Sequence, residues 1–291
     1  MGDSPLAPWR LSRLLLHRRD SIGTAYHVLT FEADAPLAAR AGQFAMVRSA
    51  AWGQAPLLPR PMSLLTSGDR PSILIKVVGE GTRRLSHASS GEPFDLLAPL
   101  GLPWRPSPER HRPVLVAGGV GVAPLLFLAR ELARLVIGVP PPASRAEGSR
   151  PSRPLALYGA RTAGDLPLDF ELAGVTELRV ATEDGSRGTR GHVTVLLARA
   201  LDELAAAGHA SKVYTCGPHA MMGAVAALCA ARGVLCEASL ETPMACGYGV
   251  CLGCPVPHAT GRGFLYACTD GPCVDAGTVD WARSASQSAP R

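Results

Sequence analysis

The feature that most constrains this chain is a group of cysteines near its C-terminal end, in the stretch CGYGVCLGC. Cys246, Cys251 and Cys254 follow the spacing C-x4-C-x2-C, and Cys268 supplies a fourth thiol further along. This spacing with a more distant fourth cysteine is that of plant-type [2Fe–2S] sites. The intervening glycines let backbone amides approach the sulfur atoms, where their hydrogen bonds stabilise a reduced cluster. The pattern therefore predicts a [2Fe–2S] centre held by these four residues.

The thiols also allow other uses. Zinc sites favour two short C-x2-C pairs and have less need of a glycine-rich loop, so zinc is the weaker alternative. The N-terminal segment lacks the long apolar stretch of a signal peptide, which makes a reducing, cytoplasmic location the default and disulfides the exception. Cys273 is either a spare thiol near the cluster or an alternative ligand to Cys268. Cys229 and Cys236 are expected to be small core residues.

Length and composition limit the class of protein. A chain of 291 residues predicts about two or three domains, and a hydrophobic content of 47% is enough for a core. The net charge of +5 comes mostly from scattered arginines without a block of like charges, so no nucleic-acid interface is expected. No run approaches about 18 apolar residues, so no membrane span is expected either.

The N-terminal third, residues 8–108, predicts an antiparallel β-barrel. Short apolar or alternating runs bounded by Gly, Pro, Asp and Ser follow each other closely, which is typical of a small barrel. A short helix is expected after the last run, with Thr82 as its cap. The runs are residues 26–33, 42–49, 60–66 and 72–79.

From residue 112 the pattern changes to alternating strands and helices, which predicts a parallel, doubly wound, Rossmann-like α/β domain over residues 109–238. The segment 138–154 is rich in Pro, Ser and Arg, has no periodicity, and is predicted to be a flexible surface loop. Residues 239–283 would form a small [2Fe–2S] module. Residues 284–291 are predicted to be a disordered tail.

Two glycine turns at strand ends predict a dinucleotide site. In residues 118–124 a strand ends, glycines turn the chain, and the next helix points its N-terminal amides at the turn, which suits a pyrophosphate. Pro124 stands at the last glycine position of G-x-G-x-x-G, so the pattern is incomplete. Residues 216–218 repeat the turn at a later strand, which would put Cys216 beside a nicotinamide. A turn without a ligand and a buried Cys216 remain alternatives.

The barrel carries residues suited to a flavin nucleotide. Arg60 can form a bidentate ion pair with a phosphate, and the Ser63 hydroxyl can form a hydrogen bond with the edge of a flavin. Gly81 and Thr82 open a helix, which is again a seat for a phosphate. These residues alone do not separate a flavin site from a plain barrel with an exposed arginine.

Together the motifs RPMS, GEGT, AGGVGVAP, CGP, CGYGVCLGC and CTDGP resemble the ferredoxin-reductase superfamily. Within it, their order resembles the electron transfer subunit of NAD-dependent dihydroorotate dehydrogenase. Reductases of aromatic-ring oxygenases differ from this chain in the longer gap before their fourth cysteine. The flavin subunit of NADH-dependent ferredoxin:NADP oxidoreductases typically has Asp where this chain has Cys246. Lys76 departs from the arginine common in the family and lacks its bidentate fork.

The resemblance implies three groups of site residues. Those for FAD are Arg60, Pro61, Met62, Ser63, Leu74, Ile75, Lys76, Gly81 and Thr82. Those for NAD are Gly118, Gly119, Gly121, Pro124, Cys216, Gly217 and Pro218. Those for the [2Fe–2S] cluster are Cys246, Cys251, Cys254 and Cys268.

The resemblance also implies an electron relay without a catalytic acid or base. An FMN-containing catalytic subunit would oxidise dihydroorotate for pyrimidine (UMP) biosynthesis, in a heterotetramer with two copies of each chain. Electrons would pass through the cluster to FAD and leave as a hydride to NAD+. One alternative is a flavin and iron–sulfur NAD(P)H oxidoreductase subunit of a ferredoxin-linked or hydrogenase complex. The other is a zinc-stabilised binding module without redox function.

Overall fold

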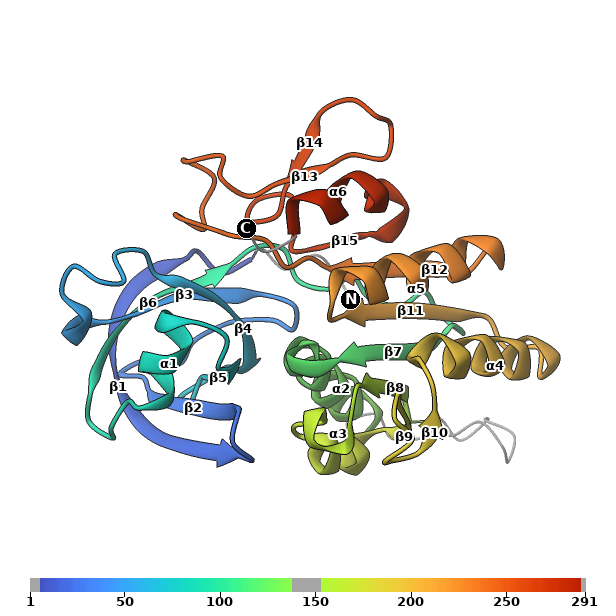
Figure 1. The fold of residues 1–291 in the computed structure, drawn as a ribbon, viewed down its shortest axis with the longest axis horizontal. Coiled ribbons are helices and arrows are strands. Elements are labelled where there is room, and N and C mark those ends of the chain that lie inside the picture. Colours follow the sequence, from blue (N-terminus) through green and yellow to red (C-terminus); the bar gives the residue numbers. More distant parts are fainter. Residues whose placement is uncertain (1–5, 138–152, 289–291) are drawn as a thin grey trace.

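The computed structural model of the protein describes residues 6–137 and 153–288. A β-barrel and a mixed sheet with helices lie side by side, and a small C-terminal module lies across both (Figure 1). Nearly all of the loop predicted at 138–154 therefore lies outside the described residues, as do residues 289–291 of the predicted tail. Within the described part of the chain, no helix is long and apolar enough to cross a membrane.

The barrel is closed, six-stranded and antiparallel, in the order β1-β2-β5-β4-β3-β6. The four predicted strands are present, and the structure adds β1 and β6, which pair with each other and close the barrel. Only Leu14 and Leu16 of β1 are buried, and its other residues, several of them charged, are exposed or half-buried. The strand therefore lacks the regular alternation of apolar and polar residues that would predict it. The strands are β1 Arg10–Ile22, β2 Tyr26–Glu32, β3 Phe44–Ser49, β4 Arg60–Thr66, β5 Ser72–Lys76 and β6 Pro93–Leu100.

The short helix after β5 is α1, Glu80–Ser86. Thr82 lies in its first turn rather than before it, and its Oγ1 accepts hydrogen bonds from the backbone N–H groups of Val78 and Gly79 at 2.9 and 3.1 Å. The predicted cap is therefore present, but it acts from inside the helix. The strand before it ends at Lys76, three residues earlier than the sequence pattern suggests.

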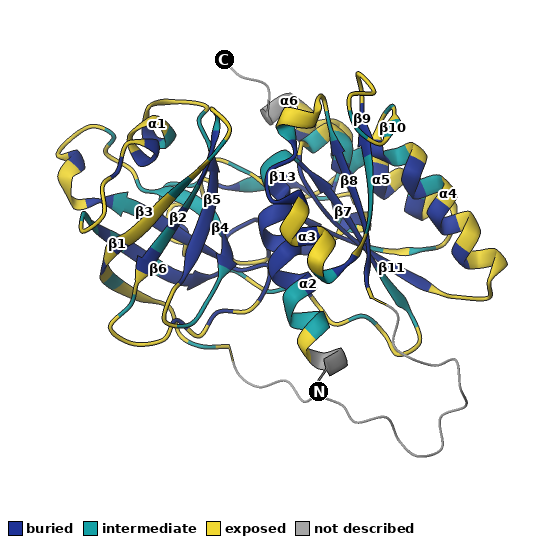
Figure 2. Ribbon diagram, turned by 90° about the horizontal axis from the view of Figure 1, so that it is seen from below, coloured by how far each residue is buried: buried dark blue, intermediate teal, exposed yellow. Residues whose placement is uncertain are grey.

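The second domain is a seven-stranded sheet in the order β10-β9-β8-β7-β11-β12-β15, parallel except for β15. This confirms the predicted α/β fold. The apolar face of α2 also packs on the barrel strand β4, so one hydrophobic core joins both domains (Figure 2). The elements are β7 Arg112–Gly118, α2 Val122–Ile137, β8 Leu155–Ala160, α3 Asp169–Val175, β9 Glu177–Thr182, β10 Thr189–Arg190, α4 Val193–Ala206, β11 Ser211–Cys216, α5 His219–Ala231, β12 Leu235–Ser239 and β15 Cys273–Asp275.

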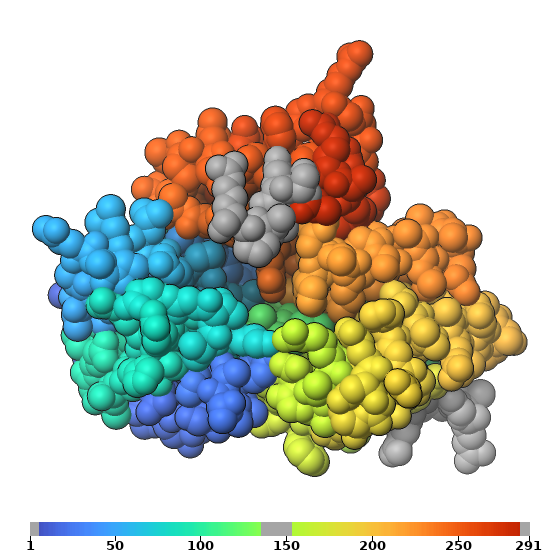
Figure 3. Space-filling model, in the orientation of Figure 1, coloured from blue at the N-terminus to red at the C-terminus, as the bar shows by residue number. Residues whose placement is uncertain are grey.

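The C-terminal module contains the hairpin β13 Pro255–Pro257 and β14 Phe264–Tyr266, then β15 and the helix α6, Trp281–Ser288. It covers the top of both domains in the orientation of Figure 3. The prediction of a disordered tail is wrong for residues 284–288, which belong to α6. The helix is held because the Trp281 indole donates a hydrogen bond to the Ala276 carbonyl at 2.9 Å and Ser284 is buried.

Candidate cofactor and cluster site

A cavity of about 800 Å³ opens between the barrel, the sheet and the module. Val120 within the first glycine turn and Ala123 just after it line the cavity from the sheet side, and Met244 lines it from the module. Most of the residues predicted for FAD line it from the barrel: Pro61, Met62, Ser63, Leu74, Ile75, Lys76 and Thr82.

Arg60 and Gly81 support this cavity rather than line it. The Arg60 side chain lies directly over Gly81, so that a Cβ on Gly81 would overlap the guanidinium. One Arg60 nitrogen, Nη1, donates to the Leu58 carbonyl at 2.9 Å. The arrangement keeps a cation next to the start of α1, where a phosphate would be stabilised by backbone N–H groups.

A second cavity, of about 600 Å³, lies at the carboxyl ends of the central parallel strands. Gly118, Gly119 and Pro218 line it, as predicted for a dinucleotide site. Gly121, Pro124, Cys216 and Gly217 are not among its lining residues. Cys216 is 1% exposed, and burial raises the pKa of its thiol well above the usual value, so the structure places it in the core.

The two glycine turns touch each other, which explains why both need glycine. A Cβ on Gly118 would lie 2.6 Å from the Met221 sulfur and 2.8 Å from Pro218 Cδ. A Cβ on Gly121 would overlap the backbone carbonyl of Cys216. The turns after β7 and β11 therefore pack backbone against backbone, and this leaves room above them for a ligand.

The dinucleotide cavity also has polar walls that the sequence patterns did not predict. Tyr26 Oη donates to Asp165 Oδ1 at 3.0 Å, and Lys76 Nζ pairs with the same oxygen at 3.2 Å. Burial opposes ionisation of Asp165, but the hydrogen bonds from Tyr26 and Lys76 lower its pKa below the usual range. No local signal marks Asp165, because its two partners lie in the other domain. Arg161, Glu183 and His192 complete the charged wall.

The four predicted cluster ligands lie in two pairs. The sulfur atoms of Cys254 and Cys268, both buried, are 3.2 Å apart. The outer pair is Cys246 and the exposed Cys251, whose thiol helps to lower the pKa of Cys246. Among the residues that the structure describes, no three ligating side chains converge to hold one metal ion. Paired thiolates fit a two-iron cluster, in which bridging sulfides leave two protein positions on each iron.

Backbone amides of the cysteine loop point at these sulfurs. Partial burial opposes ionisation of Cys246, yet the N–H groups of Cys251 and Tyr248 lower its pKa to about 6. Gly249 directs its N–H at Cys268, and the Gly253 N–H lies 3.4 Å from the Cys251 sulfur. These amides fit an anionic iron–sulfur group, because each one stabilises negative charge on sulfur.

Glycine is required in the loop by its backbone conformation. Gly247 and Gly249 have φ values of 85° and 92°, in the left-handed region that residues with a Cβ rarely adopt. A Cβ on Gly247 would also lie 2.5 Å from Met46 of the barrel. The glycines predicted to bring amides close to sulfur therefore also let the loop approach the barrel.

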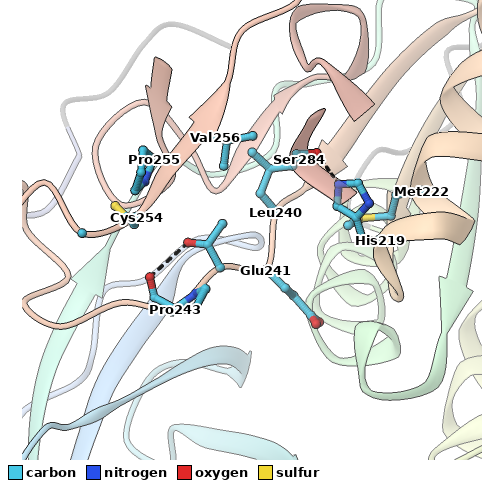
Figure 4. Close-up of a pocket in the computed structure, with 11 residues that line it drawn as sticks. His219, Met222, Leu240, Glu241, Pro243, Cys254, Pro255, Val256 and Ser284 are labelled. Atoms are coloured by element: carbon cyan, nitrogen blue, oxygen red, sulfur yellow. Dashed lines mark hydrogen bonds between the residues drawn. The ribbon is translucent and has the colours of Figure 1, made fainter. Parts of the chain in front are cut away.

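A small cavity of about 190 Å³ separates Cys254 from the flavin cavity (Figure 4). Six residues line both cavities: His219, Met222, Leu240, Glu241, Thr242 and Pro243. These six residues form a shared layer between the cavity beside Cys254 and the predicted flavin site.

Glu241 is the ionisable group of this layer that the sequence patterns missed. Its carboxylate points away from Cys254 and Val256 in Figure 4 and stays open to the cavity. Protein surrounds it closely enough that burial raises its pKa to about 7. Among the described residues, none gives it a hydrogen bond or an ion pair.

Cys273 belongs to a different environment. Its thiol is buried in the core shared by the barrel and the sheet, 3.7 Å from the carbonyl oxygen of Gly42. Cys254 and Cys268 lie in the separate core of the module. Cys273 therefore packs against the barrel, and its strand β15 pairs with β12.

The barrel, the sheet and the cysteine module together define an oxidoreductase of the ferredoxin-reductase type. A solved structure of the NADH-dependent reduced ferredoxin-NADP oxidoreductase superposes with a TM-score of 0.74 at 25% identity, over 99% of this chain and 94% of that one. The ferredoxin reductase of carbazole 1,9a-dioxygenase, at 19% identity and a TM-score of 0.64, covers 79% of this chain and 68% of its own and shares the fold.

Sequence comparison narrows the class. Residues 241–280 match the family model of the iron-sulfur cluster binding domain of dihydroorotate dehydrogenase B. The electron transfer subunit of dihydroorotate dehydrogenase B (NAD(+)) from Bacillus caldolyticus is 36% identical, over 82% of this chain and 86% of its own. That from Caldanaerobacter subterraneus subsp. tengcongensis is 33% identical, over 91% and 96%. The chain belongs to the family of dihydroorotate dehydrogenase B (NAD(+)) electron transfer subunits.

Proposed function

We propose that this chain carries electrons between a dihydroorotate-oxidising catalytic subunit and NAD+, with FAD in the larger cavity and a [2Fe–2S] cluster on the four cysteines. The observation that carries the proposal is the layer of six shared residues between the cavity beside Cys254 and the flavin cavity. When bound, FAD exchanges electrons singly or in pairs, whereas the cluster exchanges one at a time. The protein's own task is then to hold the three groups in line.

The flavin would be held by the barrel. Arg60 and the start of α1 would take its phosphates, and Ser63 would hydrogen-bond the edge of its ring. Leu74 and Ile75 would exclude water from one side of the ring, since both are nearly fully buried in the cavity wall. No side chain needs to add or remove a substrate proton in this subunit, because the oxidation of dihydroorotate takes place on the partner.

NAD would lie over the two glycine turns. The amides that open α2 and α5 favour the pyrophosphate. His219 begins α5 and lines the flavin cavity, so the nicotinamide end would point towards it. Gly121, Pro124, Cys216 and Gly217 would act by shaping the turns rather than by touching the ligand.

The partner surface would lie over the outer pair of cluster ligands, the half-buried Cys246 and the exposed Cys251. Val250 and Leu252 of the cysteine loop are 75% and 56% exposed, and the ring centroids of Trp9 and Tyr248 are 5.5 Å apart beside them. A hollow of about 470 Å³ beside Cys246 adds Leu11 and Leu58 from the barrel. Such an exposed apolar patch is typical of a subunit interface.

The expected partner is the FMN-containing catalytic subunit of dihydroorotate dehydrogenase, with two copies of each chain in a heterotetramer that serves pyrimidine (UMP) biosynthesis. A reducing compartment, the cytoplasm, would keep the ligand thiols unpaired. The second candidate is an electron-input subunit of a ferredoxin-linked or hydrogenase complex. Its resident groups would be the same, and only the chain that docks on the patch would differ.

An anaerobic visible spectrum of the purified chain, with iron and flavin assays, tests the proposal. Flavin bands and broad iron–sulfur absorption that bleach with NADH, with about two irons per chain, are expected. A protein that stays colourless after iron–sulfur reconstitution and added FAD would overturn it. Bleaching of the oxidised chain by dihydroorotate, in the absence of NADH and only when the catalytic subunit is added, separates the first candidate from the second.

A further inference from the structure

Tyr26, Lys76 and Asp165 form a polar bridge between the two large domains. Tyr26 and Lys76 are cross-strand partners on β2 and β5 of the barrel, and the Lys76 ammonium lies 5.0 Å from the centre of the Tyr26 ring. Asp165 ends the short turn Ala163–Asp165 that follows β8 of the sheet. One carboxylate oxygen, Oδ1, accepts from both barrel residues, and Thr162 Oγ1 lies 3.3 Å from the other oxygen, Oδ2.

This bridge lies where the two large cavities meet. All three residues line the dinucleotide cavity, and Lys76 also lines the flavin cavity. The side chains of Lys76 and Asp165 are 29% and 24% exposed, so a ligand in the cavity can reach both. Lys76 is thus in reach of a dinucleotide in either cavity.

The wall of the dinucleotide cavity offers few positively charged side chains to an anionic ligand. Among the described residues that line it, Lys76 and Arg161 are the lysine and the arginine, and Asp165 and Glu183 are the carboxylates. Glu183 lies 3.7 Å from His192, whereas the ion-pair partner of Lys76 is Asp165. A dinucleotide brings a dianionic diphosphate, which needs a cation and is repelled by an unpaired carboxylate.

We propose that Asp165 and the diphosphate of the dinucleotide compete for the ammonium group of Lys76. In the ligand-free protein Lys76 holds the barrel to the sheet domain through Asp165. When the dinucleotide binds, the ammonium turns to the diphosphate, and Asp165 keeps only the hydrogen bonds from Tyr26 and Thr162. Occupancy of the dinucleotide cavity thereby loosens one link between the domains. The inference rests on the proposed function, since it takes the smaller cavity as the NAD site.

Two variants change binding in opposite directions. Lys76→Met removes the cation and raises the Kd for NAD+ about tenfold, the size of one charge-assisted hydrogen bond. Asp165→Asn removes the competitor and lowers the Kd about threefold, since the amide still accepts from Tyr26 but holds Lys76 weakly. Lys76→Arg keeps the charge and restores most of the affinity. Calorimetric titration of NAD+ into the oxidised, FAD-loaded chain measures all three.

Glu183→Gln is the matched control. It removes the same charge from the same cavity but does not release Lys76, so its effect on the Kd should be clearly smaller than that of Asp165→Asn. In the Lys76→Met background Asp165→Asn and Glu183→Gln should have similar effects on the Kd, because no cation remains to be released and each variant then removes only charge repulsion. An equal effect of both acidic variants with Lys76 present, or a difference between them that persists without Lys76, would overturn the competition.

Flavin content and thermal unfolding of each variant show whether Lys76→Met has lost FAD or its fold. The Asp165→Asn and Glu183→Gln comparison decides the inference even in that case. If the unsubstituted chain binds FAD but not NAD+, the proposed function itself fails. If it binds NAD+ and Asp165→Asn leaves the Kd unchanged, only the competition is rejected.

Discussion

The carboxyl end of the sheet and the cysteine loop both use glycine to bring the backbone close to a ligand, but they do so with different support. At the sheet, the turns follow the buried strands β7 and β11 and press against each other. In the loop, Gly247 and Gly249 adopt left-handed conformations while their neighbours Tyr248 and Val250 are exposed. The dinucleotide site is therefore shaped before its ligand arrives.

The cluster site depends more on its ligand. Its thiolates lie in one buried pair and one outer pair, and the amides of the loop point at sulfurs that repel one another once they ionise. Iron would remove this repulsion, so metal binding is expected to stabilise the loop. Three changes test the contrast between a site made by packing and a site completed by its metal.

The largest effect is expected from Cys254→Ser in the buried pair. A hydroxyl is a poor substitute for a thiolate, so the variant should lose nearly all of its iron while it retains FAD. Iron and flavin assays on the purified protein measure both. Cys273→Ser is the control, because that thiol packs against Gly42 and should leave the iron content unchanged. Full iron in the first variant, or iron loss in the second, would contradict the assignment of ligands.

A substitution in the glycine turns of the sheet should instead change the stability of the fold. Gly121→Ala places a methyl group into the Cys216 carbonyl, and the free energy of unfolding should fall by about 2–4 kcal/mol. Gly174→Ala in α3 is the matched control, since nothing lies within 4 Å of its Cβ position, and it should be neutral or stabilising by up to about 1 kcal/mol. Denaturant unfolding measures the free energy of unfolding of both variants. Similar values for the two would show that the turns tolerate a side chain.

The smallest of the three effects is expected for the pH dependence of unfolding, and it concerns Glu241. Burial raises its pKa from 4.5 to about 7, so the folded protein binds this proton more tightly than the unfolded chain does. The contribution to stability is full below about pH 4.5 and is lost as the pH rises towards 7. Glu241→Gln should flatten this part of the pH profile of unfolding, whereas Glu109→Gln on an exposed turn should not. A variant profile parallel to that of the unsubstituted chain would show that Glu241 titrates normally.

Local patterns predicted much of the fold because the elements carry their own signals. The glycine turn after β7, the alternation of strands and helices, and the four cysteines are all visible within short windows of sequence. The charged strand β1 and the helix α6 were missed, because each is stabilised by partners far away in the chain. Trp281, for example, contacts His219 of α5, with the ring centroids 5.1 Å apart and the ring planes tilted by 54°.

The residues of the site were predicted only in part, because only some of them lie within a sequence motif. Residues within motifs, such as Ser63 and Gly118, do line the cavities. Asp165 could not be found, because its ion pair with Lys76 joins residues 89 positions apart in different domains. Glu241 has no motif at all, and its shifted pKa follows only from how the loop before the cysteines folds over the cavity.

The strand β15 has a consequence for how the chain resists self-association. It pairs with β12 at the outer side of the sheet, through Cys273, Val274 and Asp275. Without it, β12 would expose a row of unpaired N–H and C=O groups, which is a template for strands of other molecules. The module that carries the cysteines thus also shields the sheet, and a chain that ended before residue 273 would be expected to aggregate even if its barrel were intact.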